Sequence, residues 1–182
     1  SGCICCSLVG DFADALKKVL AQFAPDRILI EPSGVGKLSD VIRAVQGGDS
    51  HDLALNSFTA VVDANKCKMY MKNFGEFFND QVEHAGAIVL SRTDSVSGDK
   101  LSAAVDMLRE HNPSAVIVTT PWDQLDGAQI LAAMERKDTL AAALDQLASE
   151  SEDEEVCPVC GHHHEHEHEH EHEHGHEHEH EH

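Results

Sequence analysis

The sequence lacks the features that several large classes of protein require. No apolar run among its 182 residues approaches the ~18 residues of a membrane-spanning helix. Lys and Arg number 13 against 33 Asp and Glu, whereas a nucleic-acid surface needs an excess of basic residues. No secretory signal peptide is visible at the start. These absences predict a cytoplasmic protein that binds neither membrane nor nucleic acid.

Basic residues are missing altogether from residues 150–182. This segment holds 13 of the 33 acidic residues, so the rest of the chain has 20 acids against 13 bases. It also holds 12 of the 15 histidines, most of them alternating with Glu from His162 onward. Since an alternation of His and Glu has no apolar face to bury, we expect residues 149–182 to form a disordered tail.

Neither an initiator Met nor a complete phosphate-binding loop is present. The stretch Gly34-Val35-Gly36-Lys37 resembles the end of such a loop. The full pattern needs Gly five residues before the second Gly, and Ser or Thr after the Lys. Glu31 and Leu38 occupy those places. We therefore expect this chain to be a piece of a longer protein, and the piece itself to lack the phosphate-binding loop.

Helical spacing of apolar residues alternates along the chain with short apolar runs. The first helix is expected between an Asp11 cap and Pro25. Further helices are expected at 37–46, 66–72, 76–84, 100–111, 127–135 and 139–148, and strands at 27–31, 58–63, 87–91 and 115–119. Strands that alternate with helices predict an α/β domain over residues 1–148, with a parallel sheet covered by helices on both faces.

Three thiols, those of Cys3, Cys5 and Cys6, lie within four positions at the start of the chain. A buried Cys acts as a small hydrophobic residue, and no ordinary core needs three together. In an extended segment a bend near Ile4 could bring all three sulfurs to one ion. Three thiolates suit Zn²⁺ or Cu(I) and leave one tetrahedral position open. Three unrelated thiols, or a strained Cys5–Cys6 disulfide, are the alternatives.

Polar residues follow the first and third expected strands, where ligands of open parallel sheets bind. After the first strand, Glu31 could hold Mg²⁺ through water and the amide of Gly34 could reach a terminal phosphate. A solvated Glu and a turn Gly are the alternative. After the third strand, the Asp94 carboxylate could accept hydrogen bonds from N1–H and the 2-amino group of guanine, a pair of donors that adenine does not have. The side chain of Arg92 could lie across the face of the base.

The tail carries a second group of metal-ligating side chains. Cys157 and Cys160 form a Cys-x-x-Cys pair that His162, His163 and His164 follow closely. Thiolates and neutral imidazoles bind Zn²⁺ or Ni²⁺, and the intervening Glu residues keep the segment soluble. A redox role for the pair would require a helix N-terminus in a thioredoxin-like setting. An affinity tag is the other alternative, although it would not explain the Cys pair.

Taken together, these motifs resemble the CobW-type metallochaperone GTPases, P-loop GTPases of the SIMIBI class that deliver zinc or cobalt to client proteins. The resemblance covers about residues 1–148 and rests on the order of Cys3-Ile4-Cys5-Cys6, Glu31-Pro32-Ser33-Gly34, Val61-Val62-Asp63-Ala64 and Ser91-Arg92-Thr93-Asp94. It implies a P-loop NTPase-like three-layer domain, of which this chain would be a part.

The resemblance also implies roles for individual residues. The three N-terminal cysteines would ligate metal, Glu31 would be catalytic and would sense the nucleotide together with Gly34, and the base-binding residues would be Ser91, Arg92 and Asp94. The implied ligands are GTP, Mg²⁺ and Zn²⁺, Co²⁺ or Ni²⁺. The implied partners are a metal-dependent client protein and a second copy of the chain. Without the phosphate loop, this chain alone is expected to bind GTP poorly and not to hydrolyse it.

Two other functions remain open from the sequence. The chain could be a zinc or nickel buffer on a degenerate α/β scaffold, without nucleotide turnover. It could also be a redox protein, which would form a stable disulfide in place of a metal site. Guanine-nucleotide affinity separates the chaperone from the buffer, and thiol counting with and without metal identifies the redox protein.

Deleting residues 150–182 is expected to leave the fold intact and to remove several weakly bound Zn²⁺ or Ni²⁺ ions. Because His must be neutral to bind metal and its reference pKa is about 6.5, the tail should release its ions on acidification. Equilibrium dialysis of both proteins at neutral and acidic pH measures this. Equal metal stoichiometry with and without the tail would contradict a metal-binding tail.

Overall fold

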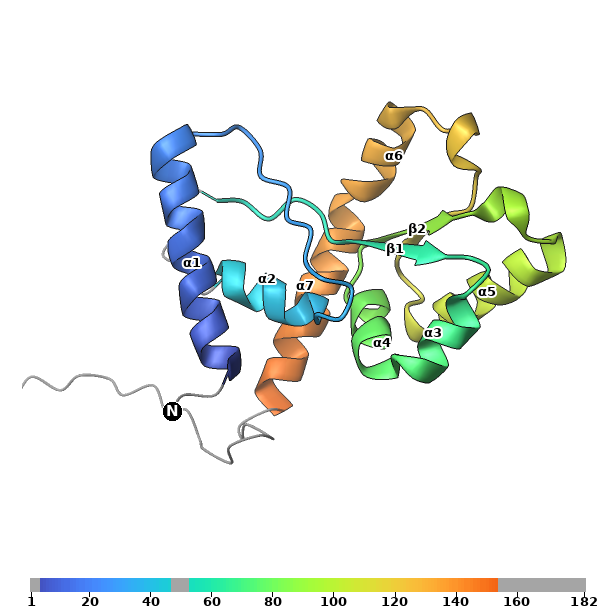
Figure 1. The fold of residues 1–182 in the computed structure, drawn as a ribbon, viewed down its shortest axis with the longest axis horizontal. Coiled ribbons are helices and arrows are strands. Elements are labelled where there is room, and N and C mark those ends of the chain that lie inside the picture. Colours follow the sequence, from blue (N-terminus) through green and yellow to red (C-terminus); the bar gives the residue numbers. More distant parts are fainter. Residues whose placement is uncertain (1–3, 47–52, 154–182) are drawn as a thin grey trace, which may run out of the picture.

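The computed structural model describes residues 4–46 and 53–153, which form an α/β fold (Figure 1). Its elements follow in the order α1 (Ile4–Phe23), α2 (Leu38–Gln46), β1 (Thr59–Asp63), α3 (Cys67–Asn73), α4 (Gly75–Glu83), β2 (Ala87–Ser91), η1 (Thr93–Ser95), α5 (Gly98–His111), β3 (Val116–Val118), η2 (Trp122–Gln124), α6 (Gly127–Met134) and α7 (Lys137–Asp153). No helix of this part of the chain is long and apolar enough to cross a membrane.

The three strands form one parallel sheet in the order β1-β2-β3. In the register, Thr59 of β1 lies beside Ala87 of β2, and Ala87 lies beside Val116 of β3. Parallel strands require crossover connections, and helices provide them here. The parallel α/β class predicted from the sequence is therefore confirmed.

Strand β2 forms the centre of the core. Its residues Ala87 to Leu90 are each at most 3 % exposed, and burying one Ile or Leu side chain contributes about 1.5–3 kcal/mol. Helices α3, α4 and α5 cover one face of the sheet, and α6 packs along β3 (Figure 1). The cover is incomplete over the edge strand β1, where Val61 is 64 % exposed.

Residues 27–31, expected to be a buried strand, are not a strand in the structure. Leu29 is 85 % exposed and Ile30 is 37 % exposed. A strand is stable only when a neighbour completes its hydrogen-bond ladder. Within the described residues no strand lies beside this segment, since β1 pairs only with β2. The prediction of a strand at residues 27–31 was therefore wrong.

Helix α1 begins at Ile4, seven residues before the expected Asp11 cap. The prediction of an extended segment around Cys5 and Cys6 was wrong, because both residues lie in the first turn of the helix. The sequence explains this, since Ile4, Leu8 and Phe12 continue the apolar spacing of the helix toward the N-terminus. The helix ends close to the expected Pro25, and Ala24 has a left-handed backbone (φ 40°).

Asn112 ties the start of β3 to the end of α4. Its side chain is buried, and its Nδ2 lies 2.8 Å from the carbonyl oxygens of Val82 and Ala85, to which it donates. Its Oδ1 accepts from the backbone N–H of Ala115 at 2.9 Å. Because both ends of the amide are satisfied inside the protein, Asn112 fixes where β3 enters the sheet.

Helix α7 continues to Asp153, beyond the expected end at residue 148. Glu150, which we expected to lie in the disordered tail, belongs to this helix and contacts His84 at the end of α4. Its Oε2 is 2.8 Å from Nε2 of the buried His84, whose Nδ1 is 2.9 Å from the carbonyl oxygen of Asp80. A deletion from residue 150 would therefore remove a contact of the folded part, and a cut after Asp153 separates the tail better.

The Glu150 carboxyl has a pKa below its ordinary value. Burial is the largest single effect and acts to raise this pKa, but the hydrogen bond and charge of His84, together with Gln146 and Arg43, outweigh it. A lowered pKa in the folded state stabilises the fold above the unfolded value of about 4.5. This stabilisation is lost as the pH falls below that value through the folded pKa.

Glu150→Gln is expected to be less stable than the wild type at pH 7, by under about 1 kcal/mol because the carboxylate is 39 % exposed. The difference should shrink as the pH falls below about 4.5. Urea unfolding at several pH values measures it. Glu110→Gln, at an exposed position of α5, is the matched control. A difference that stays constant with pH would show that the charge of Glu150 is not responsible.

Candidate functional site

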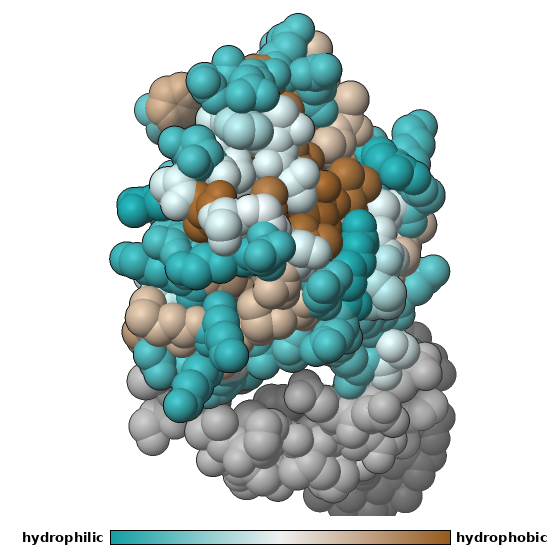
Figure 2. All heavy atoms as spheres, turned by 90° about the vertical axis from the view of Figure 1, so that its right-hand side faces the viewer, coloured by the Kyte–Doolittle hydropathy of each residue, from teal (hydrophilic) through white to brown (hydrophobic). Residues whose placement is uncertain are grey.

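A cleft of about 460 Å³ lies at the carboxyl ends of β1 and β2. These strand ends point to the right in Figure 1, and Figure 2 views the molecule from that side, where apolar surface is framed by hydrophilic side chains. The cleft is lined by Gly34, Val35, Val61, Asp63, Tyr70, Phe74, Phe78, Gln81, Ser91 and Arg92. Three of the residues predicted to bind nucleotide, Gly34, Ser91 and Arg92, therefore share one cleft.

Gly34 belongs to a turn that α4 holds at this cleft. The N–H of Gly36 donates to the carbonyl oxygen of Ser33 at 2.9 Å and closes the turn. The Gln81 side-chain amide donates to the carbonyl oxygens of Gly34 at 3.0 Å and Gly36 at 2.8 Å. A Cβ at Gly36 would lie 3.2 Å from the Ser33 oxygen, so the turn favours glycine there. Gln81 was not predicted, because nothing in a helical Gln signals such a contact.

Lys37 does not face this cleft as a phosphate-loop lysine would. Its Nζ lies 3.1 Å from Oε1 of Glu76. The hydrogen bond with Glu76 is the main reason why the pKa of Lys37 lies above its ordinary value, and burial opposes it. This contact agrees with the interpretation of residues 34–37 as something other than a phosphate loop.

Asp63 and Arg92 meet across the ends of β1 and β2. The Asp63 Oδ1 accepts from the N–H of Asn65 at 2.9 Å, so this carboxylate caps the turn that follows β1. Its Oδ2 lies 3.5 Å from Nε of Arg92. Arg92 has a left-handed backbone (φ 59°), uncommon for a residue with a side chain, and its side chain is 68 % exposed. The Arg92 guanidinium therefore contacts one carboxylate of the cleft, that of Asp63, and is otherwise exposed to solvent.

Asp94 lies in η1, two residues after Arg92, is exposed, and is not among the residues that line the cleft. Its carboxylate has no hydrogen-bond partner among the described residues, so it can accept from a ligand. The turn itself is fixed, because the carbonyl oxygen of Arg92 accepts from the Ser95 N–H at 3.2 Å and the Ser95 hydroxyl at 2.9 Å. Thr93 is buried between them, and its Oγ1 has no partner in the described part of the chain.

Glu31 is not brought to the cleft. It lies three residues before Gly34 in the exposed segment after α1, and it does not line the cavity. Of the predicted metal ligands, Cys5 and Cys6 begin α1, whereas Cys3, Cys157, Cys160, His162, His163 and His164 lie outside the described residues. Metal binding by these groups stays a prediction.

Cys67 is the one thiol in the core of the described residues, and it is 1 % exposed. Burial raises the pKa of this thiol to about 11. A metal ligand must be a thiolate, so Cys67 is not a candidate. The sequence, which places it alone between the two cysteine clusters, is consistent with this.

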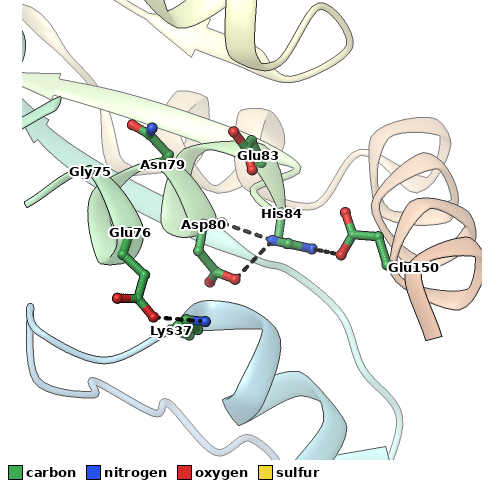
Figure 3. Close-up of a pocket in the computed structure, with 8 residues that line it drawn as sticks. All are labelled: Lys37, Gly75, Glu76, Asn79, Asp80, Glu83, His84 and Glu150. Atoms are coloured by element: carbon green, nitrogen blue, oxygen red, sulfur yellow. Dashed lines mark hydrogen bonds and ion pairs between the residues drawn. The ribbon is translucent and has the colours of Figure 1, made fainter. Parts of the chain in front are cut away.

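A second cavity, of about 410 Å³, lies between α4 and α7 and contains acidic side chains (Figure 3). Its charges are paired within the protein: Glu76 with Lys37, and Glu150 with His84. The described residues contain no group of three His, Cys, Asp or Glu side chains arranged to hold a metal ion. The contacts in this cavity are structural, and the cleft at the strand ends is the better candidate.

Trp122 is a further residue at this edge of the sheet that the sequence interpretation did not include. It follows β3 in η2, is 51 % exposed, and donates from Nε1 to the carbonyl oxygen of Leu90 at 3.2 Å. An aromatic residue a few positions after a strand was the available signal, but an exposed aromatic is common enough to carry little weight alone.

Comparison with known proteins gives a consistent result. Over 129 residues the chain is 26 % identical to the zinc-regulated GTPase metalloprotein activator 1 of Schizosaccharomyces pombe, covering 69 % of this chain and 31 % of that protein. It is 28 % identical over 129 residues to the zinc chaperone CobW of Sinorhizobium sp., covering 58 % of this chain and 36 % of that protein. The chain thus spans about a third of the length of these relatives. No solved structure matches it.

The model of one protein family matches residues 1–119. This range includes the N-terminal cysteines, and it also includes the turn at Gly34 and the strand end at Arg92, which the cleft brings together. The chain belongs to the CobW/HypB/UreG nucleotide-binding domain family.

Proposed function

We propose that this chain is part of a GTP-dependent metal chaperone that delivers zinc, or a similar ion such as cobalt, to a metal-dependent client protein in the cytoplasm. The observation that carries the proposal is the cleft at the carboxyl ends of β1 and β2, which contains Gly34, Ser91 and Arg92. The names of the two relatives, a zinc-regulated GTPase and a zinc chaperone, support the same function.

Guanine is the base that the end of β2 fits best. The exposed Asp94 carboxylate can accept from N1–H and the 2-amino group of guanine together, whereas adenine presents no such pair of donors. The Arg92 guanidinium is planar and largely solvent-exposed, so it can lie across a base. Its contact with Asp63 fixes one end of the side chain while leaving the planar face accessible.

The turn at Gly34 is suited to sense the nucleotide because it is linked to the rest of the fold. Gln81 binds the turn, and the neighbouring Asp80 accepts from the N–H and hydroxyl of Ser39 in α2, at 3.1 and 2.6 Å. Helix α2 packs against α1, which begins beside the N-terminal cysteines. A shift of the turn could therefore reach the cysteines through α4, α2 and α1.

The described residues do not by themselves form a Mg²⁺ site. Glu31, the carboxylate expected to hold the ion through water, is exposed and lies outside the cleft. In our proposal GTP hydrolysis belongs to a longer protein that supplies the phosphate loop, and Glu31 and Gly34 respond there to the terminal phosphate.

The function is tested by titrating Zn²⁺ or Co²⁺ into such a longer protein, loaded either with GDP or with a non-hydrolysable GTP analogue. If the nucleotide switches the thiolate site, the metal affinity should differ between the two states, and bound metal should change the preference for GTP over GDP by the same factor. Allosteric couplings of this kind amount to about 5- to 150-fold.

Two variants assign the signal. Cys5→Ser is expected to weaken metal binding and to abolish the difference between nucleotide states. Cys67→Ala removes a thiol that is buried and protonated at neutral pH, so it should leave both unchanged. Equal metal affinity in the GDP and GTP-analogue states would favour the alternative function, a metal buffer without nucleotide coupling.

A further inference from the structure

Trp122 has a fixed orientation at the carboxyl edge of the sheet. The carbonyl oxygen of Gly86 accepts from the N–H of Val116 in β3 at 3.0 Å. Carbonyl groups two and four residues further along a strand point to the same side, so the oxygen of Leu90 also faces β3. The indole N–H of Trp122 donates to this oxygen at 3.2 Å and thereby extends the ladder beyond Val118.

The backbone around the indole is also held in place. The N–H of Gln124 donates to the carbonyl oxygen of Pro121 at 3.0 Å, and the N–H of Leu125 donates to that of Trp122 at 3.3 Å. With its N–H engaged, the indole has only its ring faces and carbon edges to offer to a ligand. Half of the residue is nevertheless exposed to solvent.

The ring therefore lies beside the strand end that carries the proposed guanine readers. Leu90, to which the indole is bonded, precedes Arg92 by two residues and Asp94 by four. Thr93, between the two readers, has a buried hydroxyl without a partner in the described part of the chain. We propose that Trp122 forms one wall of the base site and packs its ring against the purine whose edge Asp94 reads. This inference rests on the proposed function.

The proposal assigns different tasks to the two residues. Stacking on an indole depends little on which base is bound, because every base has a π face. Hydrogen bonding to Asp94 depends on the donors of guanine. Trp122 should therefore contribute affinity for purine nucleotides in general, and Asp94 should contribute the preference for guanine over adenine.

The sequence contains one tryptophan, so a ¹H–¹⁵N spectrum of the 182-residue chain contains one indole N–H signal, that of Trp122. GMP and AMP are the probes, each titrated to its solubility limit. With GMP, the indole signal and the amide signals of residues 92–95 are expected to shift together and to fit one dissociation constant.

Trp122→Leu should weaken binding of both nucleotides by about tenfold and leave their affinity ratio unchanged. Asp94→Ala should instead make the affinities for GMP and AMP equal.

Two controls separate this role from a purely structural one. Trp122→Phe keeps an aromatic face but lacks the N–H, so it should bind GMP more tightly than Trp122→Leu. Phe23→Leu removes another exposed aromatic ring, at the end of α1, and should leave GMP binding unchanged. Amide signals outside residues 86–126 should keep their positions in Trp122→Leu if the fold is intact.

The outcomes distinguish this inference from the proposed function. If residues 92–95 respond to GMP while the indole signal does not, or if Trp122→Leu binds GMP as tightly as the wild type, the role of Trp122 is overturned and guanine reading stands. If neither the indole nor residues 92–95 respond to GMP, both the base site and this role are contradicted.

Discussion

Strand β2 is paired along both of its edges, and the positions of the candidate base-binding groups depend on this pairing. On one side the carbonyl oxygen of Ser91 accepts from Ala64, which aligns the end of β1 and brings Asp63 to Arg92. On the other side the carbonyl oxygen of Leu90 remains for the indole of Trp122. Because β2 is almost wholly buried and paired on both edges, the polar turn at residues 92–95 that follows it has a defined position.

Helix α4 connects this rigid edge to segments that are less well covered. Through Gln81 it holds the turn at Gly34, through Asp80 it holds the start of α2, and through His84 it contacts the last turns of α7. In the sequence, the two groups of predicted metal ligands, the N-terminal cysteines and the His-rich tail, precede and follow the elements that these contacts join. The proposed function requires a link between a nucleotide site and a metal site, and α4 contacts the elements that would form this link.

Local sequence patterns predicted the buried elements well and the uncovered ones poorly. Residues 87–91 were predicted with the observed bounds, because this short apolar run also has neighbouring strands on both sides that complete its ladder. Residues 27–31 have the same kind of pattern, but a strand also needs a partner, which a local pattern cannot show. The proposed base-binding residues at 91–94 were predicted from their motif. Gln81 and Trp122 were missed because they contact backbone that is distant in the sequence.

The central claim is that the end of β2 reads guanine, and the ratio of GDP to ADP affinity in a longer protein that includes the phosphate loop tests it most directly. Calorimetric titration of the wild type and Asp94→Ala provides this ratio. The wild type should bind GDP more than tenfold more tightly than ADP, since each base-edge hydrogen-bond pair contributes about 1–3 kcal/mol, and Asp94→Ala should lose this preference. Equal affinity for GDP and ADP in the wild type would contradict the account.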